Sequence, residues 1–223
     1  SAHNLGEVMD AFAGVRDLEN GILRTPANPD ITFSDDPLRM LRAVRFARRF
    51  GFEIEEETFQ GIVRNAQRTS ILSMERVSEE INKVLQSRKP SIGFKLMFKA
   101  GLLQHIFPEL YAMQGVDVRD GVGHKDNFFH TLKVVDNLSD VSTDLWLRWA
   151  ALLHDIGKPR TKRYTIGLGW SFHGHDDLGA RMVPKIFARL KLPLNEKMRY
   201  VQKLVQLHQR PIDRKSTRLN SSH

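Results

Sequence analysis

The chain has 223 residues, of which 41% are hydrophobic and 27% are charged, and its net charge is +8. This composition is typical of a soluble globular protein with one large or two small domains, and no apolar run is long enough to cross a membrane. The absence of cysteine excludes disulfides and thiolate metal sites and is expected of a protein in a reducing cytoplasm. The positive charge favours an anionic partner.

The two ends of the chain need separate treatment. Residues 1–34 are expected to form short or irregular elements, because long helices are interrupted at Gly14, Gly21, Pro26 and Pro29. Residues 213–223 resemble the translated sequence of a sequencing adapter, and we exclude them from expectations about the fold.

A helix rich in arginine is predicted from Pro37 to about Phe50. Asp35 and Asp36 supply an acidic cap, and proline is favoured at the first helical position. One face of this helix carries Arg39, Arg42, Arg45 and Arg49. Because the helix contains no acidic residue and its other sides are apolar, the pattern favours anion binding; a solvated basic face is the alternative.

Further helices are predicted at about 56–65, 74–86, 91–100 and 144–156. A glycine-rich link at 115–123 separates the third of these from the fourth. The fold class expected is therefore all-α in two helical units, with one short β-hairpin possible between 158 and 170.

Residues 17–26 and 34–47 resemble the neck of class II CCA-adding tRNA nucleotidyltransferases and the related bacterial poly(A) polymerases. The second segment contains the acid-acid-x-x-Arg motif of that family. The resemblance implies that Asp36 and Arg39 imitate a base pair to select CTP or ATP, and that Arg42 and Arg45 reach the nucleotide phosphates. Asp36 could instead only cap the helix.

The same resemblance implies a catalytic head with paired aspartates that hold Mg²⁺. Residues 1–34 contain no Asp-x-Asp pair. We therefore expect the head to precede residue 1, and we expect this chain alone not to transfer nucleotides.

The second helical unit contains histidines at inward-facing helical positions. His154 and Asp155 end an almost wholly apolar helix, and His130, His175 and His208 each continue an apolar row. A single inward histidine is more often a hydrogen-bonded core residue, but four of them beside an aspartate favour a metal site.

This pattern is similar to the HD phosphohydrolase superfamily. The resemblance implies the metal ligands His130, His154, Asp155, His175 and His208, with hydrolysis of a phosphomonoester or cyclic phosphodiester. Its final aspartate, expected one helix beyond His208, is not found, because the adapter-like residues stand at that place. Asp155 and Lys158 are the candidate catalytic residues, although Lys158 could merely place a cation at a helix end. His124 and His173 are candidate proton donors.

The resulting interpretation divides the chain into a head remnant (1–34), a helical neck and body that select nucleotide and bind RNA (35–112), a linker (113–123), a truncated HD domain (124–212) and the adapter-like end. It predicts part of a cytoplasmic enzyme that adds CCA to tRNA 3′ ends from CTP and ATP. The HD domain would bind Ni, Mn, Fe or Mg, and the head would bind Mg. The alternatives are a stand-alone HD phosphohydrolase and a poly(A) polymerase fragment acting as an RNA-binding module.

Overall fold

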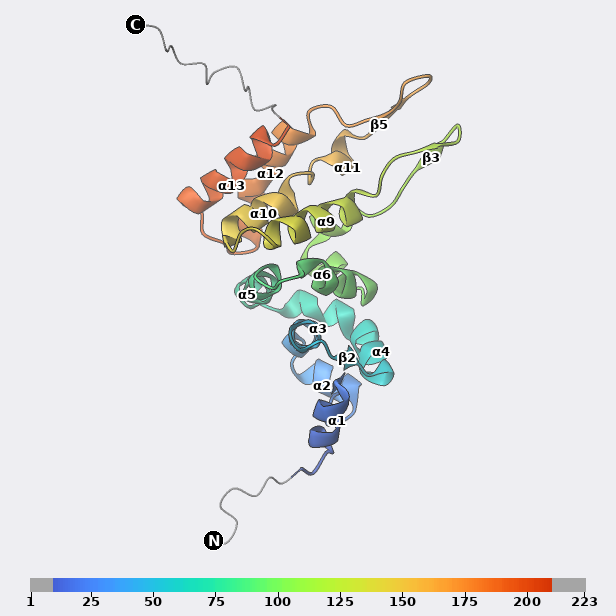
Figure 1. The fold of residues 1–223 in the computed structure, drawn as a ribbon, viewed down its shortest axis with the longest axis vertical. Helices are drawn as coiled ribbons and strands as arrows, with labels where there is room; N and C mark the ends of the chain where they lie inside the picture. The colour runs from blue at the N-terminus through green and yellow to red at the C-terminus, as the bar shows by residue number, and fades with distance from the viewer. Residues whose placement is uncertain (1–9, 210–223) are drawn as a thin grey trace, which may run out of the picture.

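The structure is a computed structural model and describes residues 10–209 of the chain. Its helices are stacked along one long axis, with α1 (Gly14–Asn20) near one end and α12 (His175–Arg189) and α13 (Glu196–Leu207) near the other (Figure 1). Within these residues, no helix is both long and apolar enough to span a lipid bilayer. The predicted all-helical fold is confirmed, and strands are confined to two-stranded sheets.

We call α1 to α8 the N-terminal layer and α9 to α13 the C-terminal layer. Besides α1, the N-terminal layer contains β1 (Ile22–Leu23), α2 (Pro29–Asp35), α3 (Leu38–Phe50), β2 (Glu53–Ile54), α4 (Glu56–Asn65), the 3-10 helix η2 (Ala66–Ile71), α5 (Met74–Leu85), α6 (Pro90–Lys99), α7 (Leu103–Ile106) and α8 (Pro108–Tyr111). The remaining elements are β3 (Val118–Arg119), β4 (Val122–Gly123), α9 (Asn127–Ser139), α10 (Leu145–Leu153), α11 (Lys158–Thr161), β5 (Arg163–Thr165) and β6 (Gly169–Ser171).

Two antiparallel hairpins project side by side from the C-terminal layer (Figure 1). The β5–β6 hairpin pairs Tyr164 with Trp170 and lies where the sequence predicted a hairpin. The β3–β4 hairpin was not predicted, because its segment was interpreted as a linker. The hairpins are joined by hydrogen bonds from the Tyr164 hydroxyl to Asp120 (2.7 Å) and from the Trp170 indole to the Val122 carbonyl (2.9 Å). The third sheet, β1 with β2, is parallel.

Helix α3 forms as its sequence predicts. The Asp36 carboxylate accepts a hydrogen bond from the Leu38 backbone N–H at 3.2 Å, which satisfies one of the free donors at the helix start. The helix ends at Gly51, whose φ of 70° lies in the left-handed region that favours glycine. Its buried face includes Met40 and Val44, so α3 lies inside the N-terminal layer and exposes Arg39, Arg42 and Arg49.

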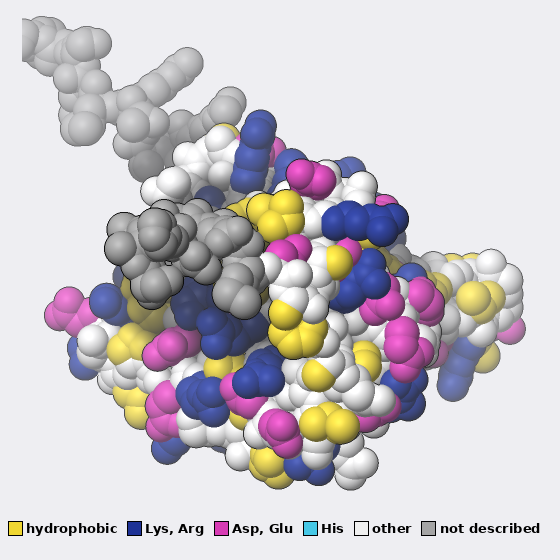
Figure 2. Space-filling view, turned by 90° about the horizontal axis from the view of Figure 1, so that it is seen from below, with side chains coloured by type: hydrophobic (Ala, Val, Ile, Leu, Met, Phe, Trp, Pro, Cys, Tyr) yellow, Lys and Arg dark blue, Asp and Glu magenta, His cyan; other side chains and the backbone are white. Residues whose placement is uncertain are grey.

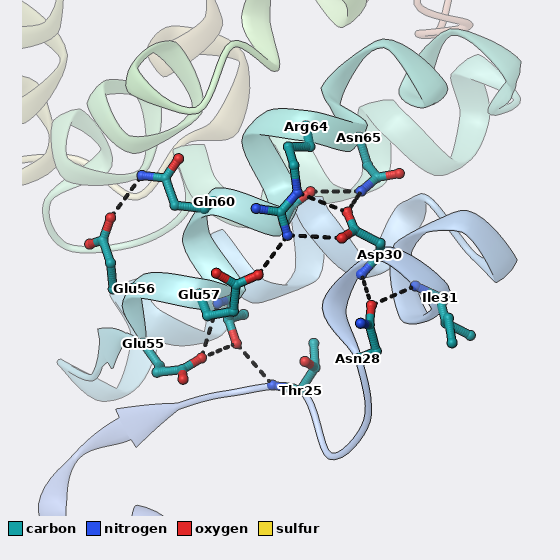
Figure 3. A network of polar contacts seen from close by, with 12 residues as sticks. Thr25, Asn28, Asp30, Ile31, Glu55, Glu56, Glu57, Gln60, Arg64 and Asn65 are labelled. Carbon is teal, nitrogen blue, oxygen red and sulfur yellow. Dashed lines mark hydrogen bonds and ion pairs between the residues drawn. The ribbon is translucent and has the colours of Figure 1, made fainter.

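Helices α2 and α4 pack closely and are joined by a polar network (Figure 3). Arg64 donates two hydrogen bonds to the Asp30 carboxylate, at 3.1 and 2.9 Å, and the Asn65 amide donates a third at 2.6 Å. A Cβ atom at Gly61 would lie 2.4 Å from the Pro29 Cβ, so only glycine permits this approach. The network holds α2 against α4, and α2 in turn contacts α3.

One buried arginine joins the two layers. Arg148 on α10 is 3% exposed, and its guanidinium donates five hydrogen bonds of 2.6 to 3.2 Å. The acceptors are backbone carbonyls at and just beyond the C-terminal ends of α5 and α9, in Leu85, Ser87, Ser139 and Ser142. Burial lowers the pKa of Arg148. Helix C-termini carry unsatisfied carbonyls and partial negative charge, so this one cation caps two helices from different layers.

The apolar core continues across the same boundary. Trp149, the residue after Arg148, is fully buried and lies near the rings of Phe107 in the N-terminal layer and Phe187 in the C-terminal layer. Its indole N–H donates to the Asn82 side chain on α5 at 2.8 Å. Helix α10 is thus the central buried helix that the sequence predicted, and it positions the site at its end.

Candidate functional site

The C-terminal end of α10 places a buried carboxylate at the centre of the C-terminal layer. The helix begins with Asp144, whose side chain accepts hydrogen bonds from the next backbone N–H groups, and it ends at Leu153, three residues earlier than predicted. Asp155 follows in the turn after the helix and is 1% exposed. Lys158 is the first residue of α11, and its ammonium lies 2.7 Å from the Asp155 carboxylate.

Four histidines surround this carboxylate. The Nε2 atoms of His154 and His130 lie 3.1 and 3.9 Å from Asp155 Oδ2. The Nε2 atoms of His175 and His208 lie 3.3 and 3.7 Å from Asp155 Oδ1. The structure therefore brings together all five residues predicted as metal ligands, as two groups that share Asp155.

The orientation of the imidazoles fits a metal. In His154, His175 and His208 the second ring nitrogen, Nδ1, lies 2.6 to 2.7 Å from a backbone carbonyl, in Ala151, Phe172 and Val205. A carbonyl can only accept, so each neutral ring carries its proton on Nδ1 and leaves the Nε2 lone pair directed toward Asp155. Imidazole and carboxylate donors in this number suit a divalent transition metal. The described residues of the HD region can therefore hold a divalent ion.

Burial and the short distances within the cluster shift the pKa values of three of its members. Burial of Asp155 opposes its charged form, but contacts with His154, His175 and His208 outweigh burial and hold the pKa of Asp155 well below its usual range. Burial also disfavours the charged form of His208, but contacts with Asp155 and the Val205 carbonyl raise its pKa overall. Burial lowers the pKa of His130, and this effect exceeds the opposing attraction of Asp155.

His130 differs from its prediction. We expected it to point into the core, but its side chain is 44% exposed, and the buried row of α9 is instead formed by Phe128, Leu132 and Val135. His130 therefore lies at the rim of the cluster. His175 is 3% exposed, as predicted, and His208 is the first residue after α13.

The two candidate proton donors, His124 and His173, are not members of the two ligand groups. His173 is exposed in the turn before α12. His124 has both ring nitrogens within hydrogen-bonding distance of backbone groups, the N–H of Asp117 and the carbonyl of Lys125. Among the described residues, the histidines with a ring nitrogen within 4 Å of the Asp155 carboxylate are the four clustered ones.

Gly157 allows the turn to reach α12. A Cβ atom at this position would lie 2.3 Å from the His175 carbonyl oxygen and 2.9 Å from the Gly179 backbone nitrogen. Neither backbone atom can move without shifting α12. The distance between Asp155 and His175 thus depends on the absence of a side chain at residue 157.

A second candidate site lies on α3. A cavity of about 420 Å³ is bordered by Arg39, Arg42 and Phe46 of α3 and by residues from the segment 23–26 and from α2. Both arginines are exposed. Asp36 is near them in sequence, caps α3 and also contacts Arg76 at 3.4 Å. Seen from the N-terminal end, Lys and Arg side chains lie among hydrophobic and acidic ones (Figure 2).

Arg45 does not border this cavity. Its guanidinium forms an ion pair with Glu80 of α5, a carboxylate that is 3% exposed, and it lies 4.1 Å above the ring centre of Phe46. This partner was not predicted, because Glu80 is 35 residues away in the sequence and belongs to another helix. The arginines predicted on one face of α3 therefore differ in their surroundings: Arg39 and Arg42 border the cavity, whereas Arg45 pairs with Glu80.

Two family descriptions match parts of the chain. Residues 51–113 match the family described as a probable RNA- and SrmB-binding site of polymerase A, and residues 127–222 match the HD domain. Among curated proteins, the Multifunctional CCA proteins of Neisseria gonorrhoeae and Tolumonas auensis are 39% and 36% identical over 194 and 197 residues. Each match covers 84% of this chain and 45 to 46% of the relative, so the chain spans less than half the length of these proteins.

Solved structures agree on the fold. A Thermotoga maritima CCA-adding enzyme complexed with tRNA covers 87% of this chain at a TM-score of 0.54 and 21% identity, and 42% of its own length is matched. An apo CCA-adding enzyme covers 87% of this chain at a TM-score of 0.54 and 23% identity, with 40% of its length matched. At this identity the likeness supports the arrangement of helices.

Proposed function

We propose that the chain is the neck, body and HD region of a class II CCA-adding tRNA nucleotidyltransferase, an enzyme that adds CCA to tRNA. The observation that carries this proposal is the 39% identity to a Multifunctional CCA protein over 84% of the chain. CTP and ATP would be the nucleotides and tRNA the acceptor, in the cytoplasm. The catalytic carboxylates and their Mg²⁺ would belong to a head region outside this chain.

The cavity bordered by Arg39 and Arg42 is the proposed nucleotide site. Guanidinium groups offer rigid pairs of N–H donors to base edges or phosphates, and Asp36 offers acceptors to an exocyclic amine. The cavity, about 420 Å³, falls within the range of small-ligand sites. Arg45 remains a predicted nucleotide ligand, but its ion pair with Glu80 would have to open or turn for it to take part.

The HD cluster is the proposed site of a second, hydrolytic activity. His130, His154, Asp155, His175 and His208 would hold one or two divalent ions, of Ni, Mn, Fe or Mg. Such an ion, when bound, lowers the pKa of water and stabilises charge on a phosphate. The protein itself fixes the three imidazole tautomers through backbone carbonyls.

Lys158 would bind a substrate phosphate at the same site. Its ammonium now neutralises Asp155, and a metal would compete with it for that carboxylate. The released ammonium of Lys158 would then pair with the substrate phosphate instead of with the Asp155 carboxylate. The substrate class would be a phosphomonoester or a cyclic phosphodiester.

The first test is nucleotide addition by the full-length enzyme that contains this chain. Arg39→Ala and Arg42→Ala should each weaken binding of CTP and ATP, measured by titration, and should reduce addition to tRNA that lacks CCA. Arg163→Ala, an exposed arginine on β5, is the matched control. If binding and selection of both nucleotides are unchanged in the α3 variants, the assignment of this cavity is wrong.

The second test concerns the HD site alone. Release of phosphate from 2′,3′-cyclic and 3′-phosphate nucleotides should require added Mn²⁺ or Ni²⁺ and should disappear in His154→Ala and Asp155→Ala. Hydrolysis that survives both changes would place the activity elsewhere. Hydrolysis without any tRNA or nucleotide binding would favour the stand-alone phosphohydrolase instead, and addition of A alone would favour the poly(A) polymerase.

A further inference from the structure

A second basic cavity lies between α3 and α5, apart from the one that contains Arg39 and Arg42. It has a volume of about 440 Å³ and is bordered by five cationic side chains and no acidic one. The cations are Arg45, Arg48, Arg49, Lys83 and Arg88. Val84, Gln86 and Ser87 complete the wall.

The cavity holds more positive charge than its neighbours neutralise. Glu80 accepts the ion pairs of both Arg45 and Lys83, so one carboxylate serves two cations. Within residues 10–209, no ion pair involves Arg48, Arg49 or Arg88. Like charges held together by two helices repel one another, and an anion placed between them relieves this repulsion.

The wall after α5 is rigid and contains a free hydroxyl. Arg148 binds the carbonyls of Leu85 and Ser87, which fixes the backbone where the wall leaves the helix. The Ser87 hydroxyl is buried and has no hydrogen-bond partner among the described residues. Rotation of this side chain would therefore break no hydrogen bond and could offer a donor to an anion.

We infer that this second cavity binds a backbone phosphate of RNA, an inference that rests on the proposed function. Guanidinium and ammonium donors dominate its wall, and such groups contact phosphate rather than read bases. Lys83 and Arg88 lie within residues 51–113, the segment that matches an RNA-binding family. Arg48 follows Arg42 by six residues, which is about 9 Å along the helix axis and about 120° around it. An RNA end next to the nucleotide cavity can thus place an upstream phosphate here.

The experiment measures how binding of tRNA without CCA depends on salt. Full-length enzymes carrying Arg48→Gln with Arg88→Gln, or Arg88→Gln alone, are compared with wild type between 50 and 200 mM salt. Each phosphate contact that is lost should make the slope of log K against log salt shallower by about 0.7 to 0.9, which is about a threefold smaller loss of affinity over this range. CTP binding should stay unchanged. Arg181→Gln on α12, an exposed arginine in the C-terminal layer, is the control.

The outcomes separate this inference from the proposal beneath it. If the wild-type full-length enzyme binds neither tRNA nor CTP, the proposed function fails and this inference fails with it. If wild type binds both and the double variant keeps the wild-type salt slope with unchanged thermal unfolding, the inference alone is overturned. The single variant Arg88→Gln alters an exposed side chain, so the test remains valid if the double variant unfolds.

Discussion

Replacement of Arg148 by methionine tests whether the two layers depend on one cation. Methionine keeps an unbranched side chain but removes five hydrogen-bond donors from four backbone carbonyls, of which Leu85 is buried and the others are partly buried. A hydrogen bond to a charged group contributes about 1.5 to 3 kcal/mol. The net loss is smaller than the sum of five such bonds, because methionine also removes the cost of burying a charge and water can reach the partly buried carbonyls. We expect a loss of about 4 kcal/mol, which for a chain of this length corresponds to a melting temperature lower by on the order of 10 °C.

The assay is urea and thermal unfolding followed by circular dichroism. Arg163→Met, which removes an exposed arginine from β5, should change the free energy of unfolding by less than about 0.5 kcal/mol. Arg148→Lys should fall between wild type and Arg148→Met, since an ammonium has three donors and a shorter reach. A loss below about 1 kcal/mol in Arg148→Met would mean that the helix ends are satisfied without this residue, and the capping argument would be wrong.

Three further changes test the metal centre and α3. Gly157→Ala should force the turn away from α12, lower the free energy of unfolding by about 1 to 3 kcal/mol and reduce the stabilisation by Mn²⁺. If this variant melts at the wild-type temperature both with and without metal, the steric argument is refuted. Wild-type protein should gain about 2.7 kcal/mol at a metal concentration 100 times Kd, and Asp155→Asn should abolish this gain. Metal affinity should fall as pH is lowered through the raised pKa of His208, because the ligand must lose its proton first; affinity that is constant with pH would exclude His208 as a ligand. Glu80→Gln should cost about 2 to 4 kcal/mol in urea unfolding, because Arg45 then lies half-buried without its carboxylate, and an unchanged midpoint would contradict this role of Glu80.

The local pattern of the chain determined the helices and most of the metal cluster. Apolar periodicity placed His175 on a buried face and predicted the buried helix that precedes His154 and Asp155. These predictions succeed because a helix that buries one face repeats every 3.6 residues, so the inward positions can be counted from the sequence. The same counting failed for His130, which lies at the rim because the buried row of α9 is displaced by about half a turn.

Only the tertiary structure decided which partners the charged residues found. The arginine helix predicts anions, but Arg45 is satisfied by Glu80 from a different helix, while Arg48 and Arg88 border a cavity formed when α3 and α5 pack. The role of Arg148 had no sequence signal, because its acceptors are backbone carbonyls, which every residue carries. Residue identity therefore fixed what each side chain can donate, and packing between distant helices fixed where that donor is used.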